Sequence, residues 1–239
     1  MRQGDSLSAT LFNLALQSAL ENVVVNGTIA NKTRLVYAYA DDIVVIAKSR
    51  KLLEETYVEL SAAARKIGLT VNINKTKYLH MTPNQRRYAN IGLNVQGETF
   101  EQVDRFVYLG VEVNDNNKVS DEIQRRILAG NRAYYANVKL LKSKLLSRAN
   151  KMMIYKTLIR PVICYGAETW NLLANDTNKL RVFERKILRR IWGAIYENGQ
   201  WRIRNNQEID EILNGQDLVQ FIKANRLRCL SQSSKMAYI

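Results

Sequence analysis

The chain has 239 residues, of which 46% are hydrophobic and 24% charged, a composition typical of a globular protein with one large or two modest domains. No apolar run reaches the 18 residues of a membrane helix, and two cysteines are too few for a disulfide framework. The single histidine, His80, excludes a site built from several histidines. We therefore expect an intracellular protein that is not secreted and does not span a membrane.

Most of the positive charge lies in the second half of the chain. The net charge is +14; residues 1–119 hold 14 basic and 12 acidic side chains, whereas residues 120–239 hold 22 and 10. This excess predicts a polyanionic partner for the second half, with nucleic acid as the first candidate and an anionic membrane surface as the second. A helical domain with a lysine-rich, solvated surface explains the composition equally well.

The first half combines helix and strand patterns. Ser8 is a suitable N-cap for a helix that reaches Glu21. Ser49 is expected to cap a second amphipathic helix, which Gly68 ends. After this helix, short strands are expected at residues 69–73, 78–81, 98–103 and 106–113.

The second half has helical periodicity throughout. The polar run at residues 114–117 is the best candidate for a domain boundary, and Ser120 is expected to cap a long helix behind it. Pro161 is expected to interrupt a helix that begins at Ser147. The chain is therefore expected to be α+β in its first half and all helical in its second. Further helices are expected at residues 177–192 and 218–231.

Between the first two helices, two β-favouring runs flank a pair of adjacent carboxylates. The pattern at residues 35–46 predicts an antiparallel hairpin with Asp41 and Asp42 at its tip. Carboxylates on a rigid turn are suited to the divalent cations that phosphoryl transfer uses. Because neighbouring strand residues face opposite sides, Asp41 is expected to be the stronger ligand. Taken alone, the dipeptide is more often a solvated turn.

A second candidate segment precedes the first helix. Arg2 and Gln3 can donate to phosphates or bases, and Gly4 lets the backbone approach a ligand closely. The start of a helix also favours phosphate. Taken alone, this segment is an ordinary capping loop.

Together, these segments resemble the reverse transcriptases. Arg-Gln-Gly-Asp-x-Leu-Ser-x-x-Leu-Phe-Asn at residues 2–13 is followed by Tyr39-Ala40-Asp41-Asp42, and residues 68–77 and 108–110 resemble the next two family blocks in the same order. Residues 161–170 and 184–191 resemble the region after the polymerase palm in LINE-type (non-LTR) retrotransposons. The resemblance extends over residues 1–192.

The resemblance implies a partial RNA-directed DNA polymerase with an antiparallel palm and packed helices. Residues 1–116 would be the back of the palm, 117–200 a helical thumb-like region and 201–239 a C-terminal helical extension. The implied reaction is nucleotidyl transfer from a dNTP to a DNA primer on an RNA template, with two Mg²⁺, in the nucleus or cytoplasm. No membrane is implied, and protein partners stay unknown.

The resemblance also implies roles for single residues. Asp41 and Asp42 would be catalytic metal ligands, and Lys75 would protonate or support the leaving phosphate; an exposed turn lysine is an equally good interpretation. The remaining implied contacts are Arg2, Gln3, Gly4 and Tyr39 with nucleotide and template; Tyr108, Leu109 and Gly110 with the primer; and Arg125, Arg126, Arg132, Lys139, Lys142, Arg185, Arg189 and Arg190 with the nucleic-acid backbone.

The sequence departs from the family pattern in two places. Ser6 and Ala9 stand where the family usually has proline. The fingers and the first metal-binding Asp of the family lie before the Arg-Gln-Gly block, which begins here at residue 2. We therefore expect the chain by itself to be inactive. The alternative is a non-catalytic, basic nucleic-acid-binding remnant of a decayed element.

Overall fold

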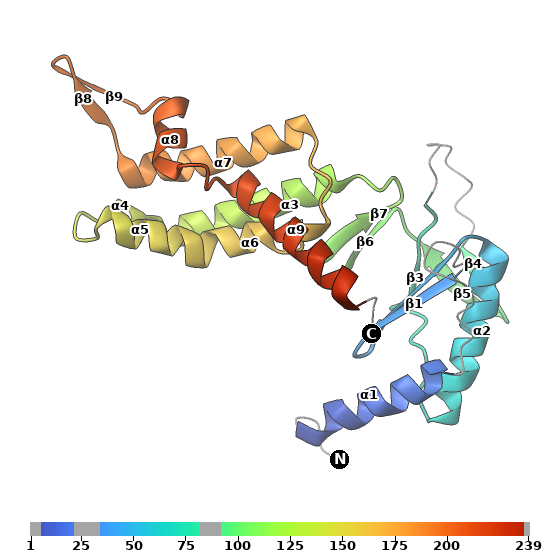
Figure 1. The fold of residues 1–239 in the computed structure, drawn as a ribbon. Coiled ribbons are helices and arrows are strands. Elements are labelled where there is room, and N and C mark those ends of the chain that lie inside the picture. Colours follow the sequence, from blue (N-terminus) through green and yellow to red (C-terminus); the bar gives the residue numbers. More distant parts are fainter. Residues whose placement is uncertain (1–5, 22–33, 82–91, 237–239) are drawn as a thin grey trace. The chain divides into compact units, whose positions relative to one another are not determined.

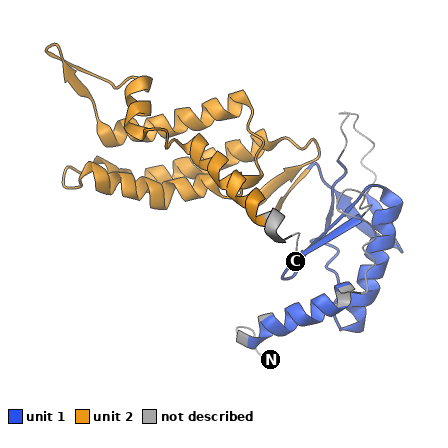
Figure 2. Ribbon diagram, in the orientation of Figure 1, with its two compact units in different colours: residues 1–104 blue, residues 105–239 orange. Residues whose placement is uncertain are grey.

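The structure is a computed structural model that describes residues 6–21, 34–81 and 92–236. The chain forms two compact units, residues 1–104 (unit 1) and 105–239 (unit 2), which we describe separately (Figure 2). Both units combine helices with small sheets, so the expected α+β class is confirmed. Within the described residues, no helix is long and apolar enough to cross a membrane.

Unit 1 contains two helices, a two-stranded hairpin and a three-stranded sheet (Figure 1). In the small sheet the strand order is β3-β5-β4, with β3 parallel to β5 and β4 antiparallel to it. The elements are α1 (Ser6–Glu21), β1 (Arg34–Tyr39), β2 (Asp42–Ala47), α2 (Arg50–Lys66), β3 (Lys77–Tyr78), β4 (Leu93–Val95) and β5 (Glu98–Gln102).

Helix α2 has both end signals that the sequence predicts. At its start the Ser49 hydroxyl accepts a hydrogen bond from the Leu52 N–H (3.3 Å), and beyond its end Gly68 has a φ of +77°. The helix contacts β1 and β2, and its Tyr57 ring meets Phe100 of β5 edge to face, with 4.9 Å between centroids. Helix α2 therefore supports both the hairpin and the small sheet.

Unit 2 combines a set of packed helices with two antiparallel hairpins (Figure 1). Its elements are β6 (Arg105–Tyr108), β7 (Val111–Asn114), α3 (Val119–Ala136), α4 (Val138–Lys142), α5 (Arg148–Ile154), the π-helical segment η1 (Tyr155–Ile159), α6 (Arg160–Cys164), the 3₁₀ turn η2 (Ala167–Thr169), α7 (Ala174–Trp192), β8 (Ile195–Glu197), β9 (Gln200–Arg202), α8 (Asn206–Leu213) and α9 (Leu218–Met236).

The core of unit 2 is apolar, and a buried carboxylate, Glu184, lies among its helices. Glu184 of α7 accepts hydrogen bonds from the Tyr155 hydroxyl and from the Leu218 N–H, both at 2.7 Å. Burial raises the pKa of the Glu184 carboxyl, although these two hydrogen bonds oppose the rise. Glu184 thus links α7 to η1 and α9. Fully buried apolar side chains around it include Ile123, Leu141, Ile159, Ile163, Leu180, Ile187, Leu218 and Ile222.

Residues 106–113, expected as one strand of the first half, lie in the β6–β7 hairpin because Leu109 and Gly110 both have positive φ and form a two-residue turn. The second half is not all helical either, contrary to the prediction from its periodicity. Asn198 and Gly199 form the same kind of turn between β8 and β9. Asn-Gly is a strong hairpin signal, but this hairpin has strands of three residues each, too short to show an alternating pattern.

Several other local predictions are wrong, and one is half correct. Ser8 does not cap α1 but lies within it, and of the strand expected at residues 78–81 only Tyr78 belongs to β3. Residues 69–73 form no strand, because no described strand pairs with them. Ser120 does not cap α3; its hydroxyl donates instead to the buried Asp176 (2.8 Å). Pro161 interrupts the regular hydrogen bonding but not the helical path. It lies in the first turn of α6, directly after the π-helical segment, and it has no N–H to donate to the preceding turn.

The two units divide between Asp104 and Arg105, earlier in the chain than the boundary expected after residue 116. The β6–β7 hairpin therefore belongs to the helical unit, and β7 contacts α3. Residues 201–239, expected as a separate extension, also lie in unit 2, where α9 contacts α7. The palm and thumb labels stay predictions.

Candidate functional site

The two adjacent acids lie at the tip of the β1–β2 hairpin, as the sequence predicts. Tyr39 pairs with Asp42, so Ala40 and Asp41 are the two central residues of the turn. Ala40 has a φ of +51°, a conformation that is costly for a residue with a Cβ and that recurs at functional sites. Both carboxylates are exposed. The turn therefore presents two negative charges to solvent on a short, tightly bent backbone.

The pairing register places Asp42 and Tyr39 on one face of the hairpin. Directly paired residues share a face, so Tyr37 and Val44 lie on the same side as this pair. Tyr39 is 67% exposed and Tyr37 is 55% exposed, so this face presents two tyrosines beside the acids. The face is thus amphipathic, with rings next to a carboxylate.

The opposite face of the hairpin is attached to α2 by a buried arginine. The Arg34 guanidinium donates to the Thr56 hydroxyl (3.3 Å) and to the Glu59 carboxylate (3.1 Å). The Arg34 side chain is nearly inaccessible, whereas that of Glu59 is partly exposed. A guanidinium held by a helix fixes the strand that leads to the turn, and hence the direction in which the acids point.

The other residues predicted for unit 1 are less well placed by the structure. Lys75 is exposed, and its backbone N–H donates to the carbonyl and side-chain oxygens of Asn72, both at 3.2 Å. Within the described part of the chain, no contact joins Lys75 to the acids of the turn, so its role stays a prediction. Arg2, Gln3 and Gly4 lie outside the described residues.

In unit 2 the turn predicted to support the primer is held by two arginines. Leu109 (φ +46°) and Gly110 (φ +77°) are its central residues, and the Gly110 carbonyl accepts hydrogen bonds from both Arg125 and Arg126 of α3. The Leu109 carbonyl accepts from the Tyr165 hydroxyl (2.9 Å). A non-glycine residue at positive φ persists only where its surroundings hold it, and these three donors do so.

A buried glutamate completes this arrangement, which we call the turn latch (Glu122, Arg125, Arg126 and Tyr165). Glu122 accepts from the Glu112 N–H of β7 (2.9 Å), from Arg125 Nε (2.7 Å) and from Arg126 Nε (2.5 Å). Burial alone would raise the pKa of the Glu122 carboxyl, but the hydrogen bonds from Arg125, the Glu112 N–H and Arg126 outweigh it and lower the pKa. Glu122 is therefore ionised and bridges strand and helix.

The latch also leaves little space at the turn. The Arg126 guanidinium lies over the Tyr165 ring, 4.5 Å from its centroid. A Cβ on Gly110 would come within 3.3 Å of the same ring. Because Gly110 also has positive φ, glycine is required there both by the backbone conformation and by the neighbouring ring. Tyr108, the third residue of the predicted primer contact, ends β6 beside the turn.

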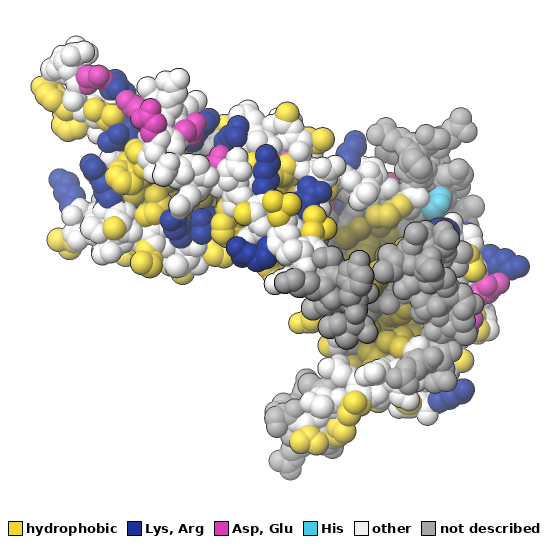
Figure 3. Space-filling view, viewed as in Figure 1, with side chains coloured by type: hydrophobic (Ala, Val, Ile, Leu, Met, Phe, Trp, Pro, Cys, Tyr) yellow, Lys and Arg dark blue, Asp and Glu magenta, His cyan; other side chains and the backbone are white. Residues whose placement is uncertain are grey.

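The eight cations predicted to contact nucleic acid fall into two groups. Arg125 and Arg126 are engaged in the latch, Arg185 donates to Asp210, and Arg189 donates to the Arg204 carbonyl and Asn206. The other four are exposed and have no hydrogen-bond or ion-pair partner among the described residues, and Lys and Arg side chains are spread over the face of unit 2 seen in Figure 3. These four are Arg132, Lys139, Lys142 and Arg190.

Sequence reasoning did not find the latch or the buried Glu184. Glu122 was interpretable only as an acid that favours a helix N-terminus, because its partner in β7, the Glu112 N–H, is ten residues away. The Gly110 carbonyl, which Arg125 and Arg126 bind, is farther still from those two arginines in sequence. Tyr165 lies in the segment at 161–170 that carries the LINE-type resemblance, which is the one signal that pointed to it.

The hairpin and its acids lie within a segment of the chain that matches a known protein family. Residues 1–113 match the family model of reverse transcriptase (RNA-dependent DNA polymerase). The RNA-directed DNA polymerase from the mobile element jockey of Drosophila funebris is 28% identical over 204 residues, which are 80% of this chain and 22% of that protein. Its counterpart in Drosophila melanogaster is 27% identical over 201 residues, with the same coverage. These matches support a LINE-type reverse transcriptase fragment.

A third relative of the chain is a transposon-derived protein of Caenorhabditis elegans that is itself uncharacterized. It is 26% identical over 189 residues, which are 79% of this chain and 67% of that protein. No solved structure matches the chain significantly. Since the chain matches about a fifth of the length of the jockey polymerases, what those whole proteins do comes to it only as a proposal.

Proposed function

We propose that unit 1 carries the metal-binding turn of an RNA-directed DNA polymerase, with Asp41 and Asp42 as its carboxylate ligands. The observation that carries this proposal is the pair of exposed acids at the tip of a two-residue turn, on a hairpin attached to α2. The match of residues 1–113 to the reverse transcriptase family supports it. In this proposal unit 1 is part of the palm and unit 2 contains the thumb.

The residues of the turn fit Mg²⁺, which prefers carboxylate oxygens and keeps several waters. Within the described residues, no group of three potential ligands surrounds the acids. Water, the phosphates of the nucleotide or a carboxylate outside the described residues would complete the coordination. Two bound Mg²⁺ would neutralise the phosphates and activate the primer hydroxyl.

The chain's own side chains would then bind and orient the nucleic acids. Tyr39 would contact the nucleotide from the face that it shares with Asp42. Lys75 would lie near the leaving phosphate, and the turn of Leu109 and Gly110 would support the primer. The exposed cations of unit 2 would contact the phosphates of the duplex without reading its sequence.

Metal binding by the turn is tested with Mn²⁺ as a spectroscopic substitute for Mg²⁺. Electron paramagnetic resonance of the full chain should detect a weak Mn²⁺ site that Asp41→Asn and Asp42→Asn each remove. Asp104→Asn, which removes an exposed carboxylate elsewhere in unit 1, should leave the site intact. Equal Mn²⁺ binding in all four proteins would refute the assignment of the two acids.

Polymerase activity is tested by extension of oligo(dT) on poly(rA) with dTTP and Mg²⁺. We expect no robust incorporation by the chain alone, since two acids supply only part of the ligands that two Mg²⁺ need. Robust incorporation that Asp41→Ala abolishes would overturn this expectation and would establish the chain as a complete enzyme.

The alternative function is nucleic-acid binding without chemistry, which the four exposed cations of unit 2 favour. It predicts affinity that falls linearly on a plot of log K against log salt, as counterions are released from the phosphates. Binding with no salt dependence, or no binding, would rule out this alternative. Salt-dependent binding without an Asp41-dependent metal site would favour it over the polymerase.

A further inference from the structure

The β8–β9 hairpin of unit 2 presents exposed aromatic side chains. Tyr196 and Trp201 are direct cross-strand partners, and their ring centroids are 5.2 Å apart. Tyr196 is 60% exposed and Trp201 is 73% exposed, which is high for aromatic side chains, because these are usually largely buried. Figure 1 shows the hairpin extending beyond the end of α7, away from the helices of unit 2. The hairpin therefore offers an aromatic surface that the unit itself does not cover.

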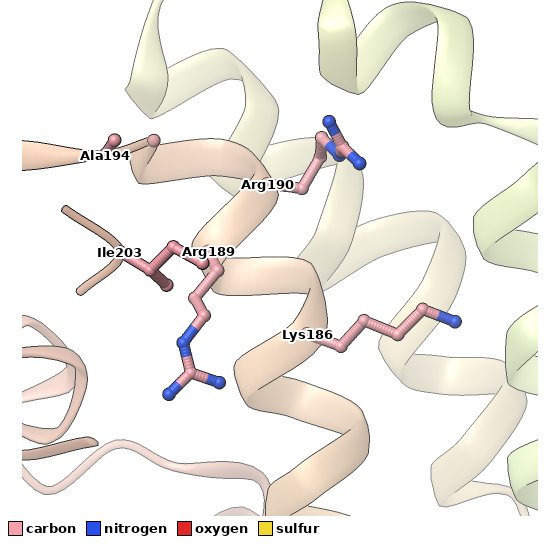
Figure 4. Close-up of a pocket in the computed structure, with 6 residues that line it drawn as sticks. Lys186, Arg189, Arg190, Ala194 and Ile203 are labelled. Atoms are coloured by element: carbon pink, nitrogen blue, oxygen red, sulfur yellow. The ribbon is translucent and has the colours of Figure 1, made fainter. Parts of the chain in front are cut away.

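A cationic pocket lies at the base of this hairpin. It has a volume of about 250 Å³ and is lined by Lys186, Arg189 and Arg190 of α7, by Gly193, and by the residues Ala194 and Ile203 that flank the two strands. Figure 4 shows the three long side chains projecting from one stretch of α7, with Ile203 beside Arg189. The pocket thus adjoins the stem of the hairpin, because Ala194 precedes Tyr196 by two residues and Ile203 follows Trp201 by two.

The three positive charges of the pocket are not neutralised by carboxylates in the described part of the chain. Lys186 donates to the side chains of Asn131 (3.0 Å) and Tyr135 (3.4 Å), which are neutral. Arg189 likewise donates to a carbonyl and an amide, and Arg190 has no partner among the described residues. An anion at this pocket would meet uncompensated charge.

The carboxylates in and next to the hairpin already form ion pairs with Arg202. Arg202 donates to Glu197 on the opposite strand. It also donates two hydrogen bonds to the Glu208 carboxylate of α8, at 2.6 and 3.1 Å. These contacts link the stem of the hairpin to α8, and both carboxylates pair with the Arg202 guanidinium. The hairpin is therefore anchored at its base, and its rings stay exposed.

We propose that the β8–β9 hairpin and the cationic pocket at its base form a binding site for single-stranded nucleic acid. A base would stack on Tyr196 or Trp201, and an adjacent phosphate would lie at the pocket near Arg190. The rings are two residues from the stem, about 7 Å along an extended strand, which one nucleotide can span. A duplex keeps its bases stacked within the helix, so it would meet only the charges.

This site lies outside residues 1–113, which match the reverse transcriptase family model. It goes beyond the proposed polymerase function, because stacking and phosphate contact need neither metal nor nucleotide. RNA and DNA single strands share the chemistry that the site recognises, namely an unstacked base beside a phosphate.

The test is fluorescence anisotropy of the full chain with labelled oligo(U), oligo(dT) and a duplex, each of about 16 nucleotides or base pairs, without metal or dNTP. The double variant Tyr196→Ala/Trp201→Ala should bind both single strands about 5- to 150-fold more weakly, since stacking contributes about 1–3 kcal/mol per base. Its affinity for the duplex should change by less than about twofold. Leu145→Ala, which truncates a side chain that is 97% exposed, is the matched control and should change neither affinity.

The pocket is tested separately with Arg190→Ala. The slope of log K against log salt for single strands should decrease by about 0.7, the value for one lost phosphate contact. Lys118→Ala, at the start of α3, controls for the loss of a charge elsewhere in unit 2.

Two results would overturn the proposal. The first is wild-type affinity of the double aromatic variant for both single strands, with an unchanged melting temperature. The second is an equal loss of affinity for single strands and duplex, since that would indicate simple charge attraction. A loss confined to oligo(U) or to oligo(dT) would support the site and identify the strand that it binds.

Discussion

Replacement of Glu122 by glutamine tests whether the turn latch holds unit 2 together. The carboxylate is buried and accepts from the Glu112 N–H, Arg125 and Arg126. Glutamine keeps the shape but removes the charge, and its amide nitrogen places a donor where the carboxylate accepted. The substitution therefore leaves at least one guanidinium N–H of Arg125 or Arg126 without a hydrogen-bond acceptor.

The size of the effect follows from how far each partner can reach water. The Arg125 side chain is 35% exposed and water can solvate it, so losing its ion pair with Glu122 costs little. The Arg126 side chain is 11% exposed and cannot. Removing one member of a buried ion pair costs about 3–5 kcal/mol, and the exposure of Arg125 favours the lower end, about 3 kcal/mol. For a unit of this size the melting temperature should fall by about 10 °C.

Tryptophan fluorescence is a suited assay because it reports on unit 2 alone. The three tryptophans of the chain, Trp170, Trp192 and Trp201, all lie in this unit. Thermal melts of the full chain are compared with those of Glu211→Gln, which removes an exposed carboxylate of α8. The control should melt within about 2 °C of the wild type.

A shift of less than about 3 °C for Glu122→Gln would refute the reasoning, because it would mean that the latch contributes no more than an ordinary surface pair. A double-mutant cycle with Arg126→Met sharpens the result. The two substitutions should be strongly non-additive, since each breaks the same ion pair.

Three further predictions concern other groups of unit 2. The raised pKa of Glu184 means that the folded protein holds this proton more tightly than the unfolded chain does, so stability should fall as the pH rises above 4.5, the ordinary value. Glu184→Gln should flatten that decline in denaturant melts taken between pH 4.5 and 7. Gly110→Ala should lower the melting temperature more than Gly199→Ala, because both have positive φ but only Gly110 has a ring within 3.3 Å of the new Cβ; equal shifts would show that the ring adds nothing. Burial raises the pKa of the Cys164 thiol to about 12, so iodoacetamide at pH 8 should alkylate the exposed Cys229 first, and Cys164 only after unfolding, as peptide mass spectrometry would report.

Several features set by neighbours in sequence were predicted correctly. The hairpin with Asp41 and Asp42, the cap at Ser49 and the helix end at Gly68 each depend on interactions within a few residues. Such interactions leave a pattern in the sequence, because the same residue types recur wherever the same backbone turn is made. The resemblance to reverse transcriptases rests on these local segments as well.

Features set by distant residues were not predictable in this way. Ser120 looks like a helix cap but bonds to Asp176, fifty-six positions away, and the Tyr165 hydroxyl is equally far in sequence from the Leu109 carbonyl. Arg125 is one of the arginines that look like phosphate contacts, yet the fold directs it to Glu122 and the turn. Charge alone cannot distinguish a solvated cation from one that a buried carboxylate holds.

The sequence by itself thus determined the position of the acids, the resemblance to reverse transcriptases and the excess of positive charge in the second half. The tertiary structure decided which cations remain available for a polyanion, which hold the turn at Gly110, and that the rings of Tyr196 and Trp201 stay exposed. The physical reason is range: turns and caps are made by adjacent residues, whereas burial and ion pairing depend on which surfaces the folded chain brings together.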